Sequence, residues 1–415
     1  MASILRMPLL RSSAGSTGPL RRWRPLAPTV PSRCLHAPPL AARIAARPRQ
    51  LKLRRAGRAH STATNSSSAD APSTDSSAAT YDYIIVGAGS AGCVLAHRLS
   101  ASGLHSVLLL ESGPPDSNLW LHLPVGYYKT THDPRWDWCF KTEAEPNLNG
   151  RILSWPRGRV LGGSSSINGM LHVRGQPEDY DGWATTHACG DGWDYESVLP
   201  YFKMSEDQEG GDRALHGAGG PVSVSNPRIS LLVVDKFLEA CVEVGIGGDG
   251  DVDLNGRNPE GAGYCQTTQR DGWRCSTATA YLKAVDHNTA NLTVATGCTV
   301  RRALITTEAT GEKRATGVEY TAAAGGGGAT ILVARARREV VLSAGAIGSP
   351  HLLMLSGVGE ASQLEDAGVP LIHELDGVGK NLQDHLQVRS VYLLRPLILS
   401  QNPSICQCLW VYLHL

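Results

Sequence analysis

The stretch Tyr83-Ile-Ile-Val-Gly-Ala-Gly-Ser-Ala-Gly-Cys-Val-Leu-Ala-His-Arg-Leu99, closed by Val107-Leu-Leu-Leu-Glu111, decides the fold of this 415-residue chain. Its apolar run predicts a buried strand, its glycines a tight turn, and the following residues a helix that begins near Ser90. The second apolar run predicts another strand that ends at an acidic residue, Glu111. The spacing G-x-G-x-x-G, which ends 19 residues before that acid, is formed by Gly87, Gly89 and Gly92.

A dinucleotide-binding βαβ unit needs each of these elements, and all are present here. Gly87 permits the tight turn, Gly89 lets the backbone approach a pyrophosphate, and Gly92 lets the helix pack closely on the sheet. The helix would direct its free N–H groups and its positive dipole end at the phosphates. Glu111 would accept hydrogen bonds from the ribose hydroxyls. We therefore predict a dinucleotide site in preference to a ligand-free glycine turn.

The charge of the chain is segregated along the sequence, although the formal net charge is only +1. Residues 1–69 contain twelve Arg and one Lys but no Asp or Glu, which leaves 26 basic against 38 acidic residues in the remainder, a net charge near −12. Such an acidic body is no natural partner for nucleic acid. The leader is rich in Arg, Ser and Ala, which is typical of an organellar transit peptide.

We expect residues 1–79 to be this transit peptide, with residues 60–79 as a flexible linker. The high Arg content favours the mitochondrion over the plastid, and a disordered basic arm that binds an acidic partner is the alternative. No run of about 18 apolar residues is present, so we expect no transmembrane segment. The ten Cys lack C-x-x-C pairs and metal-ligand spacing, so we expect buried thiols and no metal site.

The remaining sequence predicts further elements. The Gly- and Ser-rich residues 157–171 predict a loop held against something buried. We expect helices at 198–203 and 231–244, and strands at 222–225, 292–297, 318–320, 331–334 and 339–344. The glycine run 325–328 predicts a hairpin loop. The last strand runs into a glycine-rich helix with Pro350 at its start, so two strand–glycine–helix units suit one nucleotide-binding sheet interrupted by an insertion.

Together with the dinucleotide motif, three further blocks resemble the glucose–methanol–choline (GMC) oxidoreductases. Residues 158–170 are similar to the first signature of that family, 345–359 to the second, and 377–385 to another familiar stretch. The likeness covers about residues 80–388, and the choline dehydrogenase branch is the most similar. It implies an α/β fold: a Rossmann-like FAD-binding domain with inserted segments and a largely absent antiparallel-sheet substrate domain. We expect residues 389–415 to be a non-homologous, truncated tail.

The resemblance also implies which residues hold FAD. The ADP half would contact Gly87, Gly89, Ser90, Gly92 and Glu111. The flavin and its ribityl chain would contact Leu161, Gly163, Asn168, Gly169, Met170 and Leu171, and the adenine would meet the backbone of Val300. For Asn168 a loop-stabilising Asx turn is the alternative. Some family members tether the flavin through a His just before this Asn; here that position is Ile167, so we predict noncovalent FAD.

The implied activity is FAD-dependent oxidation of CH–OH groups, choline to betaine aldehyde, by hydride transfer to the flavin. The expected partners are a small-molecule alcohol and an electron acceptor, either a quinone or oxygen. Family members carry the catalytic His in a later part that this chain does not match, so we expect no catalytic base; His172 and His385 are the weaker alternatives. The competing interpretations are a catalytically incomplete FAD-binding fragment and an oxidoreductase for another primary or aromatic alcohol.

Overall fold

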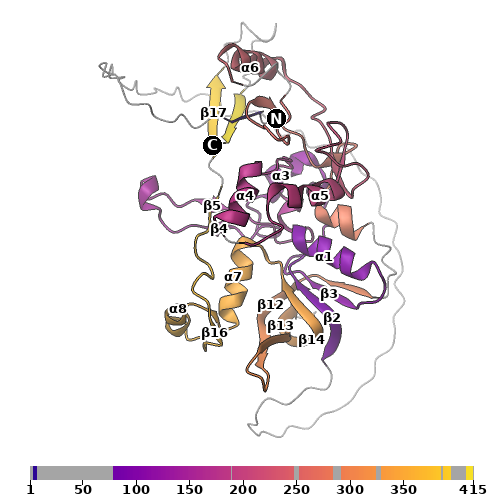
Figure 1. The fold of residues 1–415 in the computed structure, drawn as a ribbon, viewed down its shortest axis with the longest axis vertical. Coiled ribbons are helices and arrows are strands. Elements are labelled where there is room, and N and C mark those ends of the chain that lie inside the picture. Colours follow the sequence, from indigo (N-terminus) through magenta and orange to yellow (C-terminus); the bar gives the residue numbers. More distant parts are fainter. Residues whose placement is uncertain are drawn as a thin grey trace, which may run out of the picture. The chain divides into compact units, whose positions relative to one another are not determined.

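The computed structural model describes residues 78–187, 189–246, 252–283, 291–323 and 329–384, together with three short strands at 3–6, 387–393 and 408–414. Most of the predicted transit peptide, the glycine run 325–328 and His385 lie outside these residues. Figure 1 shows the described elements coloured along the sequence.

A six-stranded sheet organises the region around the glycine motif. Its strand order is β11 (Leu292–Ala295), β3 (Val107–Leu110), β2 (Ala79–Val86), β14 (Ala329–Leu342), β13 (Lys313–Ala323) and β12 (Cys298–Thr307). The first four strands are parallel, whereas the last three form an antiparallel meander. β2 and β14 are far apart in the sequence but adjacent in the sheet. This confirms the predicted nucleotide-binding sheet interrupted by an insertion.

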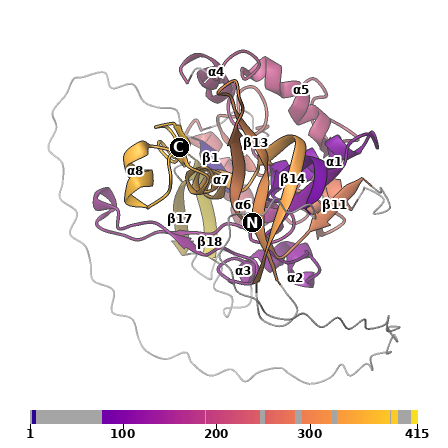
Figure 2. The same cartoon turned by 90° about the horizontal axis from the view of Figure 1, so that it is seen from below.

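Opposite faces of this sheet are covered by α1 (Ser90–Ser100) and α7 (Gly345–Leu355). Successive side chains of a strand point to opposite faces. Accordingly, Ile85 of β2 packs in one cluster with Cys93 of α1, whereas Ile84 packs in another with Leu352 of α7. In both views β14 runs between the two helices (Figures 1 and 2). The central strand β3 and the end of β2 are therefore buried on both sides, which is why Val107–Leu110 and Ile84–Val86 are continuously apolar.

Two details differ from the sequence-based prediction. The strands expected at 331–334 and 339–344 are one continuous strand, β14, whose pairing with β2 shifts register between Ala336 and Glu339. The strand thus continues through the charged run that separates the two apolar stretches, and the register shift falls at Arg337 and Arg338. The prediction that Pro350 begins the next helix was wrong, because α7 already starts at Gly345, where φ of +82° lets the chain turn.

Between β3 and β11 the chain forms short helices and small sheets. The helices are α2 (Leu119–His122), η1 (Pro124–Gly126), α3 (Tyr127–Thr130), η2 (Pro146–Leu148), η3 (Gly163–Ser166), α4 (Pro177–Thr185), α5 (Tyr195–Ser205), α6 (Leu232–Glu243) and η4 (Ala278–Leu282). The strands are β4 (Phe140–Lys141), β5 (Ser154–Trp155), β6 (Glu206–Gln208), β7 (Val222–Val224), β8 (Ala262–Tyr264), β9 (Gln269–Arg270) and β10 (Trp273–Arg274). The helices predicted at 198–203 and 231–244 are confirmed by α5 and α6.

The remaining elements follow α7. They are β15 (Val358–Gly359), α8 (Ala361–Asp366), β16 (His373–Glu374), β17 (Gln387–Leu393) and β18 (Cys408–His414). β18 pairs with β17 and with β1 (Ser3–Arg6), and β1 pairs in turn with β8. The backbone of the tail segment 408–414 is therefore paired, and the described residues of the predicted leader, Ser3–Arg6, form a strand.

Candidate cofactor site

The turn between β2 and α1 is shaped by two glycines. Gly87 has φ of +97°, and a Cβ there would lie 2.6 Å from the carbonyl oxygen of Ser343. A Cβ on Gly92 would lie only 1.9 Å from the carbonyl oxygen of Gly87. Separations this short are incompatible with a side chain. α1 can therefore start directly against the turn only because both positions are glycine.

The start of α1 offers hydrogen-bond donors to a ligand. Gly89 is the N-cap residue, no side chain caps the helix, and Ser90 in the first turn is exposed. The first N–H groups of any helix lack an acceptor within the helix. Among the described residues, a Cβ on Gly89 would meet only the Ser343 carbonyl oxygen, at 4.0 Å, so a ligand can approach the backbone closely. Free donors, the helix dipole and the missing side chain together suit a pyrophosphate.

Glu111 follows β3 directly and is buried, with 6% of its surface exposed. One carboxylate oxygen accepts the N–H of Ala88 in the glycine turn at 2.9 Å, and the other accepts the N–H of Gly113 at 2.8 Å. Burial raises the pKa of Glu111, and these two hydrogen bonds, together with the charge of Arg159, oppose the rise. Each carboxylate oxygen keeps a second lone pair for a donor such as a ribose hydroxyl.

Val300 is brought towards the same place by the start of β12. Cys298 donates its N–H to the carbonyl oxygen of Glu111 at 2.8 Å, and Thr299 Oγ1 lies 2.6 Å from Ser112 Oγ. The Val300 side chain packs in the core of the sheet. β12 is an edge strand among the described elements, so the backbone of Val300 is what could face a ligand. Its contact with adenine remains a prediction.

The loop 157–171 lies against the glycine turn. Gly162 donates its N–H to the carbonyl oxygen of Ala88 at 2.8 Å, and Leu161 donates to Pro114 at 3.1 Å. A Cβ on Gly163 would lie 2.7 Å from Gly89 Cα. The expectation of a loop held against something buried is confirmed, and the buried partner is the glycine turn itself. Residues expected to hold the two halves of FAD are thereby in direct contact.

The end of this loop carries the other predicted flavin contacts. Asn168 and Gly169 are exposed, Met170 is buried with φ of +62°, and Leu171 is 38% exposed. Asn168 Oδ1 accepts the N–H of Met170 at 3.1 Å, so the Asx turn weighed as an alternative does form. The same oxygen accepts Nη1 of Arg274 at 2.8 Å. Sequence reasoning missed this arginine, because no local pattern signals a contact between residues so distant in the chain.

Two other sequence candidates have packing roles. Ile167 is 3% exposed and belongs to a buried cluster with Leu121, Trp136 and Val160, so its side chain is not directed at a ligand. His172 Nε2 lies 3.2 Å from the buried carboxylate of Glu206. Its backbone N–H is bound to the Gln266 carbonyl oxygen. His172 is therefore part of a structural ion-pair network.

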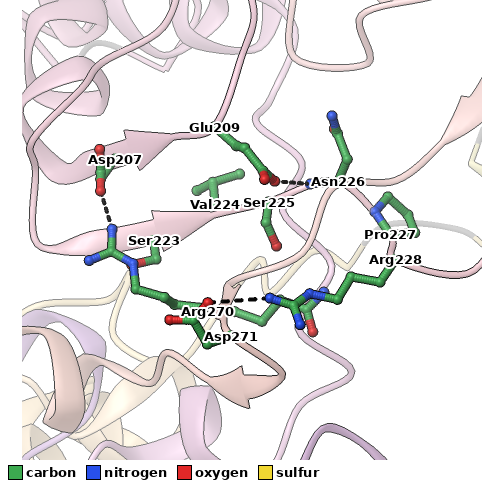
Figure 3. Close-up of a pocket in the computed structure, with 11 residues that line it drawn as sticks. Asp207, Glu209, Ser223, Val224, Ser225, Asn226, Pro227, Arg228, Arg270 and Asp271 are labelled. Atoms are coloured by element: carbon green, nitrogen blue, oxygen red, sulfur yellow. Dashed lines mark hydrogen bonds and ion pairs between the residues drawn. The ribbon is translucent and has the colours of Figure 1, made fainter.

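A hollow of about 520 Å³ lies near the end of the loop. Thr268, which precedes the lining residue Gln269, donates its N–H to the carbonyl oxygen of Met170 at 2.9 Å. Figure 3 shows that carboxylates and guanidinium groups alternate in the lining, with Arg270 paired to Asp207 and Arg228 to Asp271. None of the lining residues is aromatic. The hollow is thus not an aromatic cage of the kind that binds a quaternary ammonium.

The described residues contain neither a membrane-spanning helix nor a cluster of metal ligands. No helix within them is long and apolar enough to cross a membrane. Within the same residues, no three His, Cys, Asp or Glu side chains gather as metal ligands would.

Known proteins resemble this chain over the same region. The sequence model of the GMC oxidoreductases matches residues 81–387. The "oxygen-dependent choline dehydrogenase" of Photobacterium profundum is 44% identical over 315 residues, covering 75% of this chain and 53% of the relative. The human mitochondrial choline dehydrogenase is also 44% identical, covering 74% and 50%.

Solved structures agree with the sequence relatives. Pyridoxine 4-oxidase from Mesorbium loti superposes with a TM-score of 0.67 at 33% identity, covering 76% of this chain and 59% of that protein. The chain thus spans about half the length of the curated relatives it matches. From the glycine turn, the buried acid, the second glycine loop and these matches, we conclude that the chain belongs to the GMC oxidoreductase family, whose members use FAD.

Proposed function

We propose that this chain is the FAD-binding part of an oxidoreductase that acts on the CH–OH group of a small alcohol. The observation that carries the proposal is the joined site itself. The uncapped start of α1 at Gly89, the buried Glu111 and the loop around Gly163 are in contact with one another. Donors for a diphosphate and acceptors for a ribose therefore lie beside a glycine-rich loop that a planar ring system can approach.

In this proposal the residues divide into three groups. The ADP half is held by Gly87, Gly89, Ser90, Gly92 and Glu111, with the backbone of Val300 at the adenine. The flavin and ribityl chain lie along Leu161, Gly163, Asn168, Gly169, Met170 and Leu171. Binding is noncovalent, because the position that tethers the flavin in some relatives is the buried Ile167.

When bound, FAD supplies the hydride acceptor for alcohol oxidation. The residues of this chain bind and orient it: backbone N–H groups of the glycine loops can approach the cofactor because no side chain intervenes. Proton removal from the alcohol needs a base within hydrogen-bond reach. We assign that role to no described residue, since His172 is engaged with Glu206. We therefore propose that no catalytic base is present among the residues that the structure describes.

Choline is the proposed substrate, because relatives that are 44% identical are choline dehydrogenases. The product would be betaine aldehyde, with a quinone or oxygen as the final electron acceptor. A different alcohol is the alternative that the solved relatives favour, since they include a pyridoxine oxidase and a fungal aryl-alcohol oxidase. A non-catalytic FAD-binding fragment is the other candidate.

We further propose the domain limits and location. Residues 1–79 are a transit peptide and linker, 80–388 the FAD-binding domain, and 389–415 a segment unlike the family. The Arg-rich, acid-free leader and the mitochondrial human and mouse relatives support delivery to the mitochondrion. Bacterial relatives are equally similar, so the leader carries most of this argument.

The test is purification of the full-length chain and measurement of its absorbance spectrum, with and without added FAD. We expect a yellow protein that releases all its FAD on denaturation, because the flavin is not covalently attached. A folded protein that stays colourless in excess FAD contradicts the proposal. Dye reduction with choline, benzyl alcohol and pyridoxine then separates the substrates. Bound FAD without turnover of any alcohol favours the non-catalytic fragment.

A further inference from the structure

Arg274 is a buried cation next to the loop expected to hold the flavin. It ends β10 and is 2% exposed. Its Nη1 donates to the Ser165 carbonyl oxygen at 3.0 Å and to Asn168 Oδ1 at 2.8 Å. Its Nε and Nη2 are buried without a hydrogen-bond partner among the described residues. Burial lowers the pKa of Arg274 to about 10, so it stays charged at neutral pH.

This contact fixes which way the Asn168 amide faces. A guanidinium and a backbone N–H can only donate hydrogen bonds. The atom of Asn168 that faces both Arg274 and the N–H of Met170 must therefore be the oxygen. The amide nitrogen, with its two N–H groups, is consequently directed away from Arg274. Asn168 is exposed, so these donors are available to a ligand.

The position of the loop itself does not depend on Arg274 alone. Ser165 Oγ donates to the Gly162 carbonyl oxygen at 2.6 Å and lies 2.9 Å from Thr277 Oγ1, and it accepts the N–H of Thr277 at 3.0 Å. Ser166 Oγ donates to the Leu161 carbonyl oxygen at 2.8 Å. Without the guanidinium, two contacts thus anchor the loop to Thr277 and two more hold its own shape. Burying the charged guanidinium of Arg274 costs free energy. Because other contacts already hold the loop, support of the loop does not explain why a charged residue is buried here.

We propose that Arg274 is a positioning residue for the cofactor: it holds the Asn168 amide so that the amide N–H groups donate to the flavin. The inference rests on the proposed function. A hydrogen-bond donor at the flavin stabilises the reduced form more than the oxidised form, because the ring system gains negative charge when it takes up electrons. Arg274 therefore acts on flavin affinity and on the reduction potential, without touching the substrate.

The experiment is a double-mutant cycle in the full-length protein with Arg274→Met, Asn168→Ala and the double variant. Methionine fills the buried site with an apolar chain of similar length and removes every donor. FAD affinity is measured by titrating the apoprotein, and the two-electron midpoint potential by dye equilibration. Loss of one hydrogen bond is expected to weaken FAD binding about tenfold in each single variant. The potential is expected to fall by about 30 mV, the equivalent of a tenfold change for a two-electron couple.

The double variant decides between the proposed role and simple support of the loop. If Arg274 acts through Asn168, the double variant matches either single variant. If Arg274 only supports the loop through Ser165, the two effects add, and the proposal is wrong. If Arg274→Met does not fold, the cycle is run with Arg274→Lys in its place, because lysine keeps the charge and a hydrogen-bond donor. The midpoint potential of Arg274→Lys should then lie between those of the wild-type protein and Asn168→Ala. Asn168 is exposed, so Asn168→Ala is expected to fold in either case.

The matched control is Arg174→Gln. Arg174 is a second buried arginine, three residues after the loop, and its guanidinium binds the Glu206 carboxylate instead of Asn168. It is expected to lower thermal stability and leave the potential unchanged. If the wild-type protein binds FAD but Arg274→Met alters neither affinity nor potential, the inference fails and the proposed function stands. If the wild-type protein binds no FAD, both fail together.

Discussion

At the scale of single residues, the cofactor site depends on positions where only one residue type fits the surrounding backbone. Gly92 faces the Gly87 carbonyl oxygen, and Glu111 accepts two backbone N–H groups, one on each carboxylate oxygen. Gly92 permits the glycine turn because it has no side chain, and Glu111 holds the turn through its two hydrogen bonds. Changes at these positions should therefore affect folding and cofactor binding together.

Gly92→Ala should disrupt the turn. The added Cβ would lie 1.9 Å from a backbone oxygen, and a backbone atom cannot move aside without displacing α1 from the sheet. Overpacking of this kind costs about 1–3 kcal/mol or more. Gly182→Ala is the control, since Gly182 lies within α4 and a Cβ there meets nothing within 4 Å. Thermal unfolding and the content of bound FAD are measured for both variants. Equal stability of the two variants would contradict the packing argument.

Glu111→Gln should weaken cofactor binding and lower stability, although the side chain keeps its size. The amide keeps one acceptor oxygen but turns its nitrogen towards either Ala88 or Gly113, whose N–H groups need acceptors. A buried N–H left unpaired costs about 1–3 kcal/mol. We expect that loss in urea unfolding and at least tenfold weaker FAD binding. Glu239→Gln, on the exposed face of α6, should change neither quantity.

At the scale of elements, the insertion is held together by a buried ion-pair network. Glu206 begins β6 and is 1% exposed; it binds Arg174, His172, His216 and the N–H of Gly217. His216 Nε2 continues the network to Asp253 at 2.7 Å. Several short segments with little apolar surface of their own therefore meet at one carboxylate.

This network should make stability depend on acid pH. Burial alone would raise the pKa of Glu206, but hydrogen bonds from His172, Gly217 and Arg174 outweigh it and lower the pKa to about 2 from 4.5. A lowered pKa contributes stability above the unfolded value, which is lost as the pH falls from 4.5 towards 2. The contribution at neutral pH is about 3 kcal/mol.

Glu206→Gln should remove that contribution. We expect the variant to be less stable by about 3 kcal/mol at neutral pH, with the difference from wild type shrinking as the pH falls below 4.5. Urea unfolding midpoints between neutral and acid pH measure this. Glu239→Gln, which breaks an exposed pair, should follow the wild-type curve. A gap between Glu206→Gln and wild type that stays constant with pH would show that the carboxylate does not titrate in this range.

At the scale of the whole molecule, charged residues are distributed unevenly along the chain. The leader carries the positive charge, while the body that contains the cofactor site is acidic. A positively charged segment without acidic residues is typical of an organellar transit peptide, which is the role proposed for it.

Fusion of residues 1–79 to a fluorescent protein tests the proposed location. In plant cells, which contain both organelles, we expect the fusion in mitochondria and not in plastids. A variant with Arg21, Arg22, Arg54 and Arg55 changed to Gln should stay in the cytosol, because it loses a third of the leader's arginines. Diffuse fluorescence of the unaltered fusion would contradict the assignment as a transit peptide.

The sequence by itself determined the βαβ unit, the glycine turn and the acid after β3. These features are local, and each is specified by characteristic residue types: glycines at a tight turn, continuous runs of apolar residues in the strands, and an acid at a strand end. It also predicted that the loop 157–171 is pressed against something buried. It misjudged β14 and the start of α7, because strand pairing and a glycine with positive φ override local composition.

Only the tertiary structure decided how these local pieces meet. The contact of Gly163 with Gly89, the pairing of β2 with β14, and the bond from Arg274 to Asn168 join residues that are far apart in the chain. Such contacts depend on where the whole chain packs, and no spacing along the sequence encodes them. The physical reason is that the sequence specifies which polar groups need a hydrogen-bond partner when they are buried. Which partner each group meets depends on how the whole chain folds.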